Sequence, residues 1–273
     1  MRAELARAIQ LAREAGELVL AIRGQGVDVE YKPGDEPVTR ADREASALIV
    51  GGLRESFPQD VVISEELEVD PARLSQPRVW YVDPIDGTRD FIRGADGFAV
   101  MIGLCVDGAP SLGVVYQPTR ARTYFAYAGG PALMEEADGA ELPLGVSTIS
   151  EPGQCRLAAS ASHRSADIDR VKTELGILDE LNVGSVGLKL CLIAAGARDL
   201  YVNPVAKTKA WDTCAPQIIL ERAGGRLTDL HGAQLDYRDE ELGHRHGLVG
   251  SNGHAHEAVI AKLATLFPGK APG

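Results

Sequence analysis

Asp83 and Asp86 lie three residues apart, on either side of Pro84 and just before Gly87. They follow the apolar residues 79–82, which predict a buried strand. Because Pro84 removes an N–H group and Gly87 permits a tight turn, the two carboxylates can converge at the end of that strand. Two converging carboxylates repel each other unless a cation lies between them, and oxygen-rich sites of this kind suit Mg²⁺. The segment therefore predicts a magnesium site, although the same residue types are also ordinary turn formers.

Two further segments bring acidic side chains to the end of an element. Residues 61–66 are typical of a short apolar strand that ends in two glutamates, the first of which is Glu65. A helix with apolar periodicity begins near Asp212, which on its own would be interpreted as an N-cap. Three separate element ends would together supply a carboxylate set that suits two metal ions: Glu65, Asp83, Asp86 and Asp212.

In this order, the three segments resemble the inositol monophosphatase superfamily. The resemblance is carried by Glu65-Glu66 after a strand, by Asp-Pro-Ile-Asp-Gly-Thr at residues 83–88 and by Trp211-Asp212, and it extends over about residues 1–265. It implies a Mg²⁺-dependent, lithium-sensitive phosphatase. It also implies an α/β protein folded as a layered αβαβα sandwich of the sugar-phosphatase type, with an α+β N-terminal lobe, an α/β C-terminal lobe and the site between them.

The same resemblance implies how two or three Mg²⁺ ions would be held. One ion would be bound by Glu65, Asp83 and the carbonyl oxygen of Ile85, and a second by Asp83, Asp86 and Asp212. The substrate phosphate would bridge the two ions, with Asp83 as their shared ligand. In such a two-metal arrangement one ion activates water and the other stabilises the leaving oxygen.

A catalytic relay is implied at Thr88. In the family a threonine at this position orients the attacking water, and an aspartate from a Thr-x-Ala-Asp segment polarises the threonine, which would here be Asp42. Judged locally, Thr39 and Asp42 also fit a capping box at a helix start. The backbone N–H groups of Gly87 and Thr88 would hold phosphate oxygens.

The second half of the chain resembles the 3′(2′),5′-bisphosphate nucleotidase branch, both around Trp211-Asp212 and in residues 160–164 and 185–189. The match implies that the adenosine 5′-phosphate end of the substrate is surrounded by Ser160, His163, Ser185 and Lys189, with Asp212 also touching the substrate. The expected reaction is removal of the 3′-phosphate from adenosine 3′,5′-bisphosphate, which yields AMP.

Several alternatives remain open at this point. The chain could instead be an inositol-1-phosphatase-type enzyme that acts on inositol monophosphate or a related sugar phosphate, or a non-catalytic sensor of phosphate ligands. Lys189 could extend along an amphipathic helix towards solvent without binding a ligand. Lys207 and Lys209 could serve a second phosphate or balance the acids. His244-x-His246 and His254-x-His256 have the spacing of zinc ligands but are expected to be solvated loop residues.

The elements that must position these residues follow from periodicity and turn signals. An N-terminal lobe, residues 1–146, is expected to carry most metal ligands, and a C-terminal lobe, residues 147–273, to carry Asp212 and the specificity segments. The first half predicts helices at 1–22 and 39–57, a weak strand at 27–31, a polar loop at 32–37, an antiparallel meander of strands 98–106, 112–117 and 123–127, and a link between lobes at 135–153. The second half predicts strands at 156–160, 181–183, 200–202, 226–228 and 248–249, with helices at 165–175, 188–197 and 254–267 and the helix that Asp212 begins.

The composition of the chain argues against some classes of binding partner. A net charge of −11 argues against non-specific binding to nucleic acid or to an anionic membrane. It also makes bound cations necessary if the substrate is an anionic phosphate. No apolar run reaches membrane-spanning length, and the four cysteines (105, 155, 191 and 214) have no Cys-x-x-Cys spacing, which favours free thiols in a reducing cytoplasm. We therefore expect a cytoplasmic monomer or homodimer that acts on a small phosphate compound.

Overall fold

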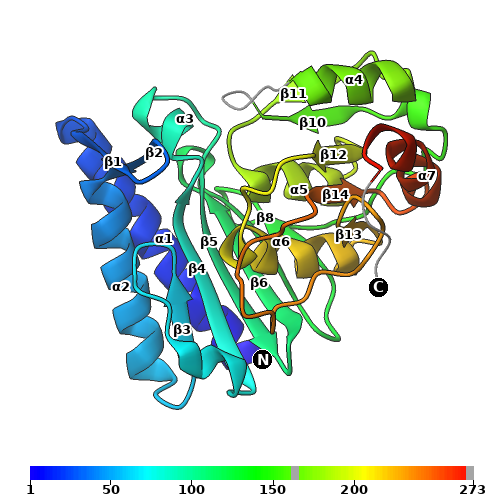
Figure 1. Ribbon diagram of the computed structural model, residues 1–273. Coiled ribbons are helices and arrows are strands. Elements are labelled where there is room, and N and C mark those ends of the chain that lie inside the picture. Colours follow the sequence, from blue (N-terminus) through cyan, green and yellow to red (C-terminus); the bar gives the residue numbers. More distant parts are fainter. Residues whose placement is uncertain (161–165, 269–273) are drawn as a thin grey trace.

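The computed structural model describes residues 1–160 and 166–268, and its elements form five layers. Helices α1 (Arg2–Gln25) and α2 (Arg40–Ser56) form the first layer, and a seven-stranded sheet forms the second. Helices α5 (Val186–Ala194) and α6 (Ala210–Arg222) separate that sheet from a five-stranded one. Helices α4 (Ala166–Leu175) and α7 (His256–Leu266) cover the far side (Figure 1). This arrangement confirms the predicted αβαβα sandwich.

The larger sheet holds most of the acidic positions predicted for the site. Its strands pair in sequence order, β3 and β4 in parallel and each later pair antiparallel. They are β3 (Val61–Ser64), β4 (Arg78–Asp86), β5 (Ala99–Val106), β6 (Ala109–Gln117), β7 (Arg122–Tyr127), β8 (Leu133–Glu135) and β9 (Glu141–Pro143). The short helix α3 (Thr88–Ile92) follows β4, and a two-stranded hairpin, β1 (Val29–Lys32) and β2 (Glu36–Thr39), precedes α2.

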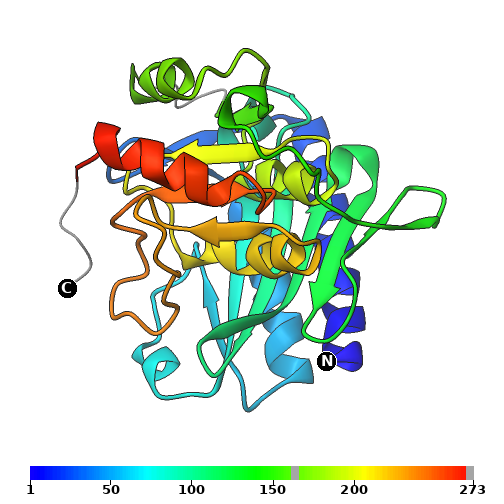
Figure 2. The same cartoon turned by 90° about the vertical axis from the view of Figure 1, so that its right-hand side faces the viewer.

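The smaller sheet has the strand order β11-β10-β12-β14-β13, with β10 parallel to β11 and β12 and the other pairs antiparallel. Its strands are β10 (Leu157–Ala159), β11 (Glu180–Asn182), β12 (Leu200–Asn203), β13 (Arg226–Thr228) and β14 (Leu248–Ser251). Figure 2 shows α7 lying in front of this sheet. Apolar side chains of β10, β12 and β14 pack there against α4 and α7. Among the described residues, none of the helices is both long and apolar enough to span a bilayer.

Each face of the larger sheet has its own hydrophobic core. Trp80 and Val82 of β4 face the stripe of apolar residues that α1 and α2 present at helical spacing. Ala99 and Met101 of β5 point the other way, into the core formed by α5, α6 and the smaller sheet. Side chains alternate between the two faces of a sheet. The face that carries Ala99 and Met101 is directed at the smaller sheet, so the residues of a site between the two sheets must point from this second face.

A β-bulge in β4 brings both predicted carboxylates to that second face. Asp83 pairs with Met101 and Asp86 pairs with Ala99, so three residues of β4 span two residues of β5. In a regular strand, residues three apart point to opposite faces, but one inserted residue restores them to the same face. Pro84 lies inside the bulge, where the regular hydrogen bonds between β4 and β5 are already interrupted, so its missing N–H group removes none of them.

Helix α6 lies unusually close to the sheet because glycines face it. A Cβ atom on Gly113 would come within 2.1 Å of the carbonyl oxygen of Ala215. A Cβ atom on Gly103 would come within 2.7 Å of the backbone nitrogen of Ala215. Both contacts are with the backbone of α6. The two glycines therefore set the distance between the sheet and the helix that carries Asp212.

Gly113→Ala is expected to destabilise the protein by roughly 1–3 kcal/mol, because the added methyl group would have to displace helix backbone. Urea denaturation would measure the change in the free energy of unfolding. Gly51→Ala is a matched control, since a Cβ atom there meets nothing within 4 Å in the interior of α2. That change should stabilise the protein by about 0.5–1 kcal/mol. Equal effects at the two positions would show that Gly113 does not set the approach of α6.

Three sequence expectations need correction. In the expected loop 32–37, residue 32 ends β1 and residues 36–37 lie in β2. In the expected link 135–153, residue 135 ends β8 and residues 141–143 form the last strand of the larger sheet. Pairing partners, which local composition does not reveal, turn both segments into strands. The expected solvated loop is also wrong for two histidines, since His244 and His256 are buried and hydrogen-bonded to Thr213 and Thr228. All four cysteines are buried and free.

Candidate active site

Residues from both halves of the chain line a cavity of about 220 Å³ beside the bulge of β4. The first half contributes the acids and turn predicted from sequence, and the second half contributes residues of α5, β12 and the segment that leads into α6. The lining residues that were predicted are Glu65, Asp83, Ile85, Asp86, Gly87, Thr88, Ser160, Lys189 and Asp212. Ser185 is completely buried and does not line the cavity, and His163 lies outside the described residues.

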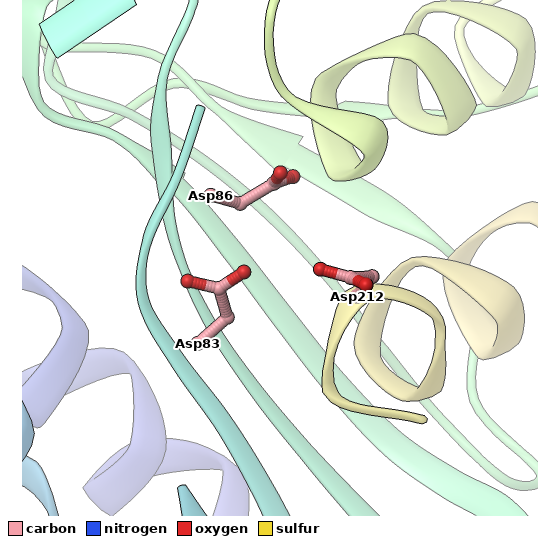
Figure 3. Close-up of side chains that lie close together, drawn as sticks. All are labelled: Asp83, Asp86 and Asp212. Carbon is pink, nitrogen blue, oxygen red and sulfur yellow. The ribbon is translucent and has the colours of Figure 1, made fainter. Parts of the chain in front are cut away.

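Three carboxylates converge at the cavity. Figure 3 shows Asp83 and Asp86 pointing from β4 towards Asp212, which comes from the first turn of α6. One oxygen from each of the three lies within 4.8 Å of the others. Residues from two distant parts of the sequence thus come together, and they are three of the four carboxylates that the ordered motifs predicted; Glu65 lines the cavity but is not in this group.

The protein holds one oxygen of each carboxylate with N–H or O–H donors. Asp86 Oδ2 accepts from Ser185 Oγ at 2.5 Å and from the Gly187 N–H group at 2.8 Å, both at the start of α5. Asp212 Oδ2 accepts from the backbone N–H of Lys209 at 2.6 Å. Asp83 Oδ1 accepts from the N–H of Ile85 at 3.0 Å. These bonds fix the carboxylate orientations before any ligand binds.

The electrostatics of this cluster call for a cation. Burial, followed by the negative charge of Glu65 and Asp86, raises the pKa of Asp83 well above its ordinary value. Burial and the charges of Asp86 and Glu65 do the same to the pKa of Asp212. Burial also raises the pKa of Glu65 to about 7. A donor set made of buried carboxylate oxygens fits a hard divalent cation such as Mg²⁺, which would lower all these pKa values.

The cation site leads to a pH-dependent prediction. Buried carboxyls with raised pKa values keep protons that the unfolded chain has lost, so the metal-free protein should lose stability as pH rises from about 4 through 7. Mg²⁺ must displace those protons and should therefore bind more tightly at pH 8 than at pH 6. We expect a larger Mg²⁺-induced rise in Tm at pH 8, against NaCl at matched ionic strength. Equal rises at both pH values would contradict the carboxylate site.

Lys32 connects the β1–β2 hairpin to the acids after β3. Its Nζ lies 3.3 Å from Glu65 Oε1 and 2.5 Å from Glu66 Oε1. The sequence placed Lys32 in a polar loop and assigned it no role in the site, because no local pattern links it to residues more than thirty positions away. In the folded protein it neutralises part of the acidic cluster that Glu65 belongs to.

Thr88 and Asp42 are in contact, as the resemblance implied. Thr88 Oγ1 lies 3.3 Å from Asp42 Oδ1 and 3.1 Å from the carbonyl oxygen of Ile85. The other oxygen of Asp42 accepts from both the N–H and the hydroxyl of Thr39, at 2.8 and 2.6 Å, in a capping box at the start of α2. Burial raises the pKa of Asp42 to about 6. One oxygen of Asp42 therefore caps α2, as the local pattern predicted, and the other is free to contact Thr88.

Gly87 allows the turn that places Thr88. Its φ of 95° lies in the left-handed region, and a Cβ atom would approach the carbonyl oxygen of Gly97 to 2.7 Å and the backbone nitrogen of Ser185 to 3.1 Å. Both constraints require glycine at this position. The turn thereby brings the start of α3 against the start of α5.

Lys189 is almost completely buried, with 1% of its surface exposed. Its Nζ donates to the carbonyl oxygens of Val183 and Gly184 at 3.0 and 2.9 Å, so the side chain does not extend to solvent. Burial lowers the pKa of Lys189 to about 8, although the nearby charge of Asp86 favours the protonated form. Asp90, which the sequence reasoning missed, also lines the cavity and accepts from the N–H of Gly184 at 3.1 Å.

The chain is similar over most of its length to several known proteins. A model described as the inositol monophosphatase family matches residues 1–266. A 3′(2′),5′-bisphosphate nucleotidase CysQ from Salmonella typhimurium is 37% identical over 87% of this chain and 95% of its own length. A histidinol-phosphatase from Mycobacterium tuberculosis is 34% identical over 95% of this chain and 97% of its own. A solved IMPase from Thermotoga maritima superposes with a TM-score of 0.83 at 27% identity, covering 97% of this chain and 98% of that one.

Proposed function

Since the chain belongs to the inositol monophosphatase family and is a phosphatase of that family, we propose that it removes the 3′-phosphate from adenosine 3′,5′-bisphosphate in a Mg²⁺-dependent, lithium-sensitive reaction. The observation that carries the phosphomonoesterase chemistry is the convergence of Asp83, Asp86 and Asp212 next to the contact between Thr88 and Asp42. The nucleotidase similarity over most of the chain supports the choice of substrate.

In this proposal the acids would hold the metal ions, and the ions would hold the phosphate. Glu65, Asp83 and the carbonyl oxygen of Ile85 would bind one Mg²⁺, and Asp83, Asp86 and Asp212 a second. When bound, the ions would neutralise the phosphate charge and make a water molecule more acidic. The carboxylates would hold the ions, and the positive charge of the ions would let this acidic cavity accept an anionic substrate.

The residues of the chain itself would orient the attacking water and move its proton. Thr88 Oγ1 would donate to Asp42 and accept a hydrogen bond from the water, so that the water lone pair faces the phosphorus atom. Asp42 is held by its capping contacts to Thr39, which keep its second oxygen directed at Thr88. The N–H groups of Gly87 and Thr88 would bind phosphate oxygens, and Ser160, Ser185, Lys189 and His163 remain predicted residues of the nucleotide end.

A second candidate is hydrolysis of histidinol phosphate, which the 34% identity to a histidinol-phosphatase over 95% of the chain favours. An inositol monophosphatase activity is a third candidate from the same family. All three would use the same acids, so the metal site does not distinguish them. A sensor without turnover would not need the contact between Thr88 and Asp42.

Phosphate release from a panel of substrates tests the proposal. Adenosine 3′,5′-bisphosphate, histidinol phosphate and inositol 1-phosphate would be compared at equal concentration, with Mg²⁺ and with EDTA. We expect the highest kcat/KM for the adenosine bisphosphate, and no activity with EDTA. Preference for either monophosphate would refute the proposed substrate while leaving the phosphatase chemistry standing, and turnover of any of them excludes a pure sensor.

A further inference from the structure

Two lysines line the cavity on the segment that leads into α6. Lys207 and Lys209 are separated by Thr208, which is buried, whereas Lys207 is exposed and Lys209 partly exposed. Lys207 lies in a turn, in which its N–H donates to the carbonyl oxygen of Val205 at 3.0 Å, and Lys209 has extended backbone angles; both line the cavity. The backbone N–H of Lys209 bonds Asp212, which places the pair directly beside the carboxylate cluster.

The segment that carries them is held by backbone bonds. The carbonyl oxygen of Thr208 accepts from the N–H of His244 at 2.9 Å, and the N–H of Ala210 donates to Leu242 at 2.8 Å. Lys209 and Gly243 form an isolated antiparallel bridge between these two bonds. These bonds hold Lys209 independently of its side chain, and Lys207 lies in the turn that comes directly before them.

Neither lysine is paired with an acid among the described residues, although the charge of Lys209 contacts an aromatic ring. No ion pair joins Lys207 or Lys209 to a carboxylate in residues 1–160 or 166–268, and Lys209 Nζ lies 4.9 Å from the ring centroid of Trp211. Lys32, by contrast, pairs with two glutamates, and Lys189 donates to two carbonyl groups. If the pair only balanced the acids, its ammonium groups should contact them, as that of Lys32 does.

We propose that Lys207 and Lys209 form a subsite for the second phosphate group of a bisphosphorylated substrate, with the first phosphate at the carboxylate cluster. The inference rests on the proposed function, and it assigns the 5′-phosphate to this pair in place of the buried Ser185 and Lys189. Two ammonium groups that line one cavity attract an anion, and a phosphate dianion matches their combined charge. A substrate with one phosphate leaves the pair unsatisfied, and histidinol phosphate would in addition bring an amine towards it.

The experiment compares adenosine 3′,5′-bisphosphate with adenosine 3′-monophosphate, which differ only in the 5′-phosphate. The measured quantity is the ratio of their kcat/KM values in wild type, in Lys207→Ala and in Lys207→Ala/Lys209→Ala. We expect the preference for the bisphosphate to fall roughly tenfold for each lysine removed, the effect of one charged hydrogen bond, and to appear in KM more than in kcat. The Lys209 change keeps the backbone N–H that holds Asp212.

Two control variants separate charge from structure. Lys207→Arg/Lys209→Arg keeps both charges and should retain most of the preference, whereas Lys262→Ala removes an exposed lysine of α7 outside the cavity and should leave the ratio unchanged. The wild-type preference should also weaken as ionic strength rises, because the subsite is partly exposed.

The outcomes distinguish the subsite from the proposed function. If wild type prefers the bisphosphate and the double alanine variant keeps that preference, the subsite is refuted and the nucleotidase function stands. If wild type does not hydrolyse the bisphosphate, the nucleotidase function fails. In that case, inhibition of p-nitrophenyl phosphate hydrolysis by each nucleotide tests the subsite. Stronger inhibition by the bisphosphate than by the monophosphate, lost when the two lysines are replaced, would support the subsite. Equal inhibition by both nucleotides would refute the subsite.

Discussion

Asp83→Asn is expected to abolish phosphate release while leaving the protein folded. Asp83 lies close to Asp86 and Asp212 and is affected by the charge of Glu65, and the proposed ligand sets of the two ions share it. An amide keeps the shape of the side chain but carries no charge to offset either ion. Activity in Mg²⁺ should fall below a few per cent of wild type, and Mg²⁺ should no longer raise the Tm.

The metal-free variant should at the same time be more stable than the metal-free wild type near pH 8, because the substitution removes one of several buried like charges. Differential scanning calorimetry in EDTA measures this. Asp28→Asn removes an exposed carboxylate outside the cavity and controls for the change in net charge. Retention of substantial activity, or an unchanged Mg²⁺ effect on Tm, would show that Asp83 does not bridge two ions.

Thr88→Ala and Asp42→Asn should each lower kcat by about 10²–10⁴-fold, the usual range for groups that move a proton in the transition state. The 3.3 Å contact between the two side chains makes them one unit, so the double variant should lose little more than either single variant. Steady-state kinetics of all three variants with the preferred substrate would measure this. Additive losses would mean that the residues act separately.

Asp42 also caps α2, so its substitution has a structural cost that must be separated from catalysis. Thr39→Ala removes one side-chain donor to the cap oxygen of Asp42 but leaves the oxygen that faces Thr88. Loss of such a cap costs about 0.5–2 kcal/mol of stability. We expect Thr39→Ala to lower stability about as much as Asp42→Asn does, with a much smaller effect on kcat. If the two variants lose the same activity, Asp42 acts only through the helix.

Local sequence was sufficient to predict the elements that carry the acids. Apolar runs ending in acids predicted β3 and β4, and the Thr-x-x-Asp pattern predicted the start of α2, because strand alternation and helix capping depend on residues a few positions apart. The order of the motifs was enough to indicate the family and, through it, the five layers. Within the described residues, the predicted ligands Asp83, Asp86 and Asp212 do lie together.

Only the tertiary structure decided how these residues meet. The spacing of Asp83 and Asp86 would place them on opposite faces of a regular strand, and it is pairing with β5 that creates the bulge and turns both to one face. Asp212 reaches them because Gly103 and Gly113 let α6 approach the sheet.

Contacts between distant segments also decided which polar side chains are hydrogen-bonded inside the protein and which can bind a ligand. Ser185 and Lys189 are engaged inside the protein, whereas Lys207 and Lys209 face the cavity without an acidic partner among the described residues. His244, which local composition assigned to solvent, is buried against Thr213. Sequence patterns record which residues are neighbours along the chain, but burial, hydrogen-bond partners and local charge depend on which segments pack together. These quantities therefore became visible only in the folded molecule.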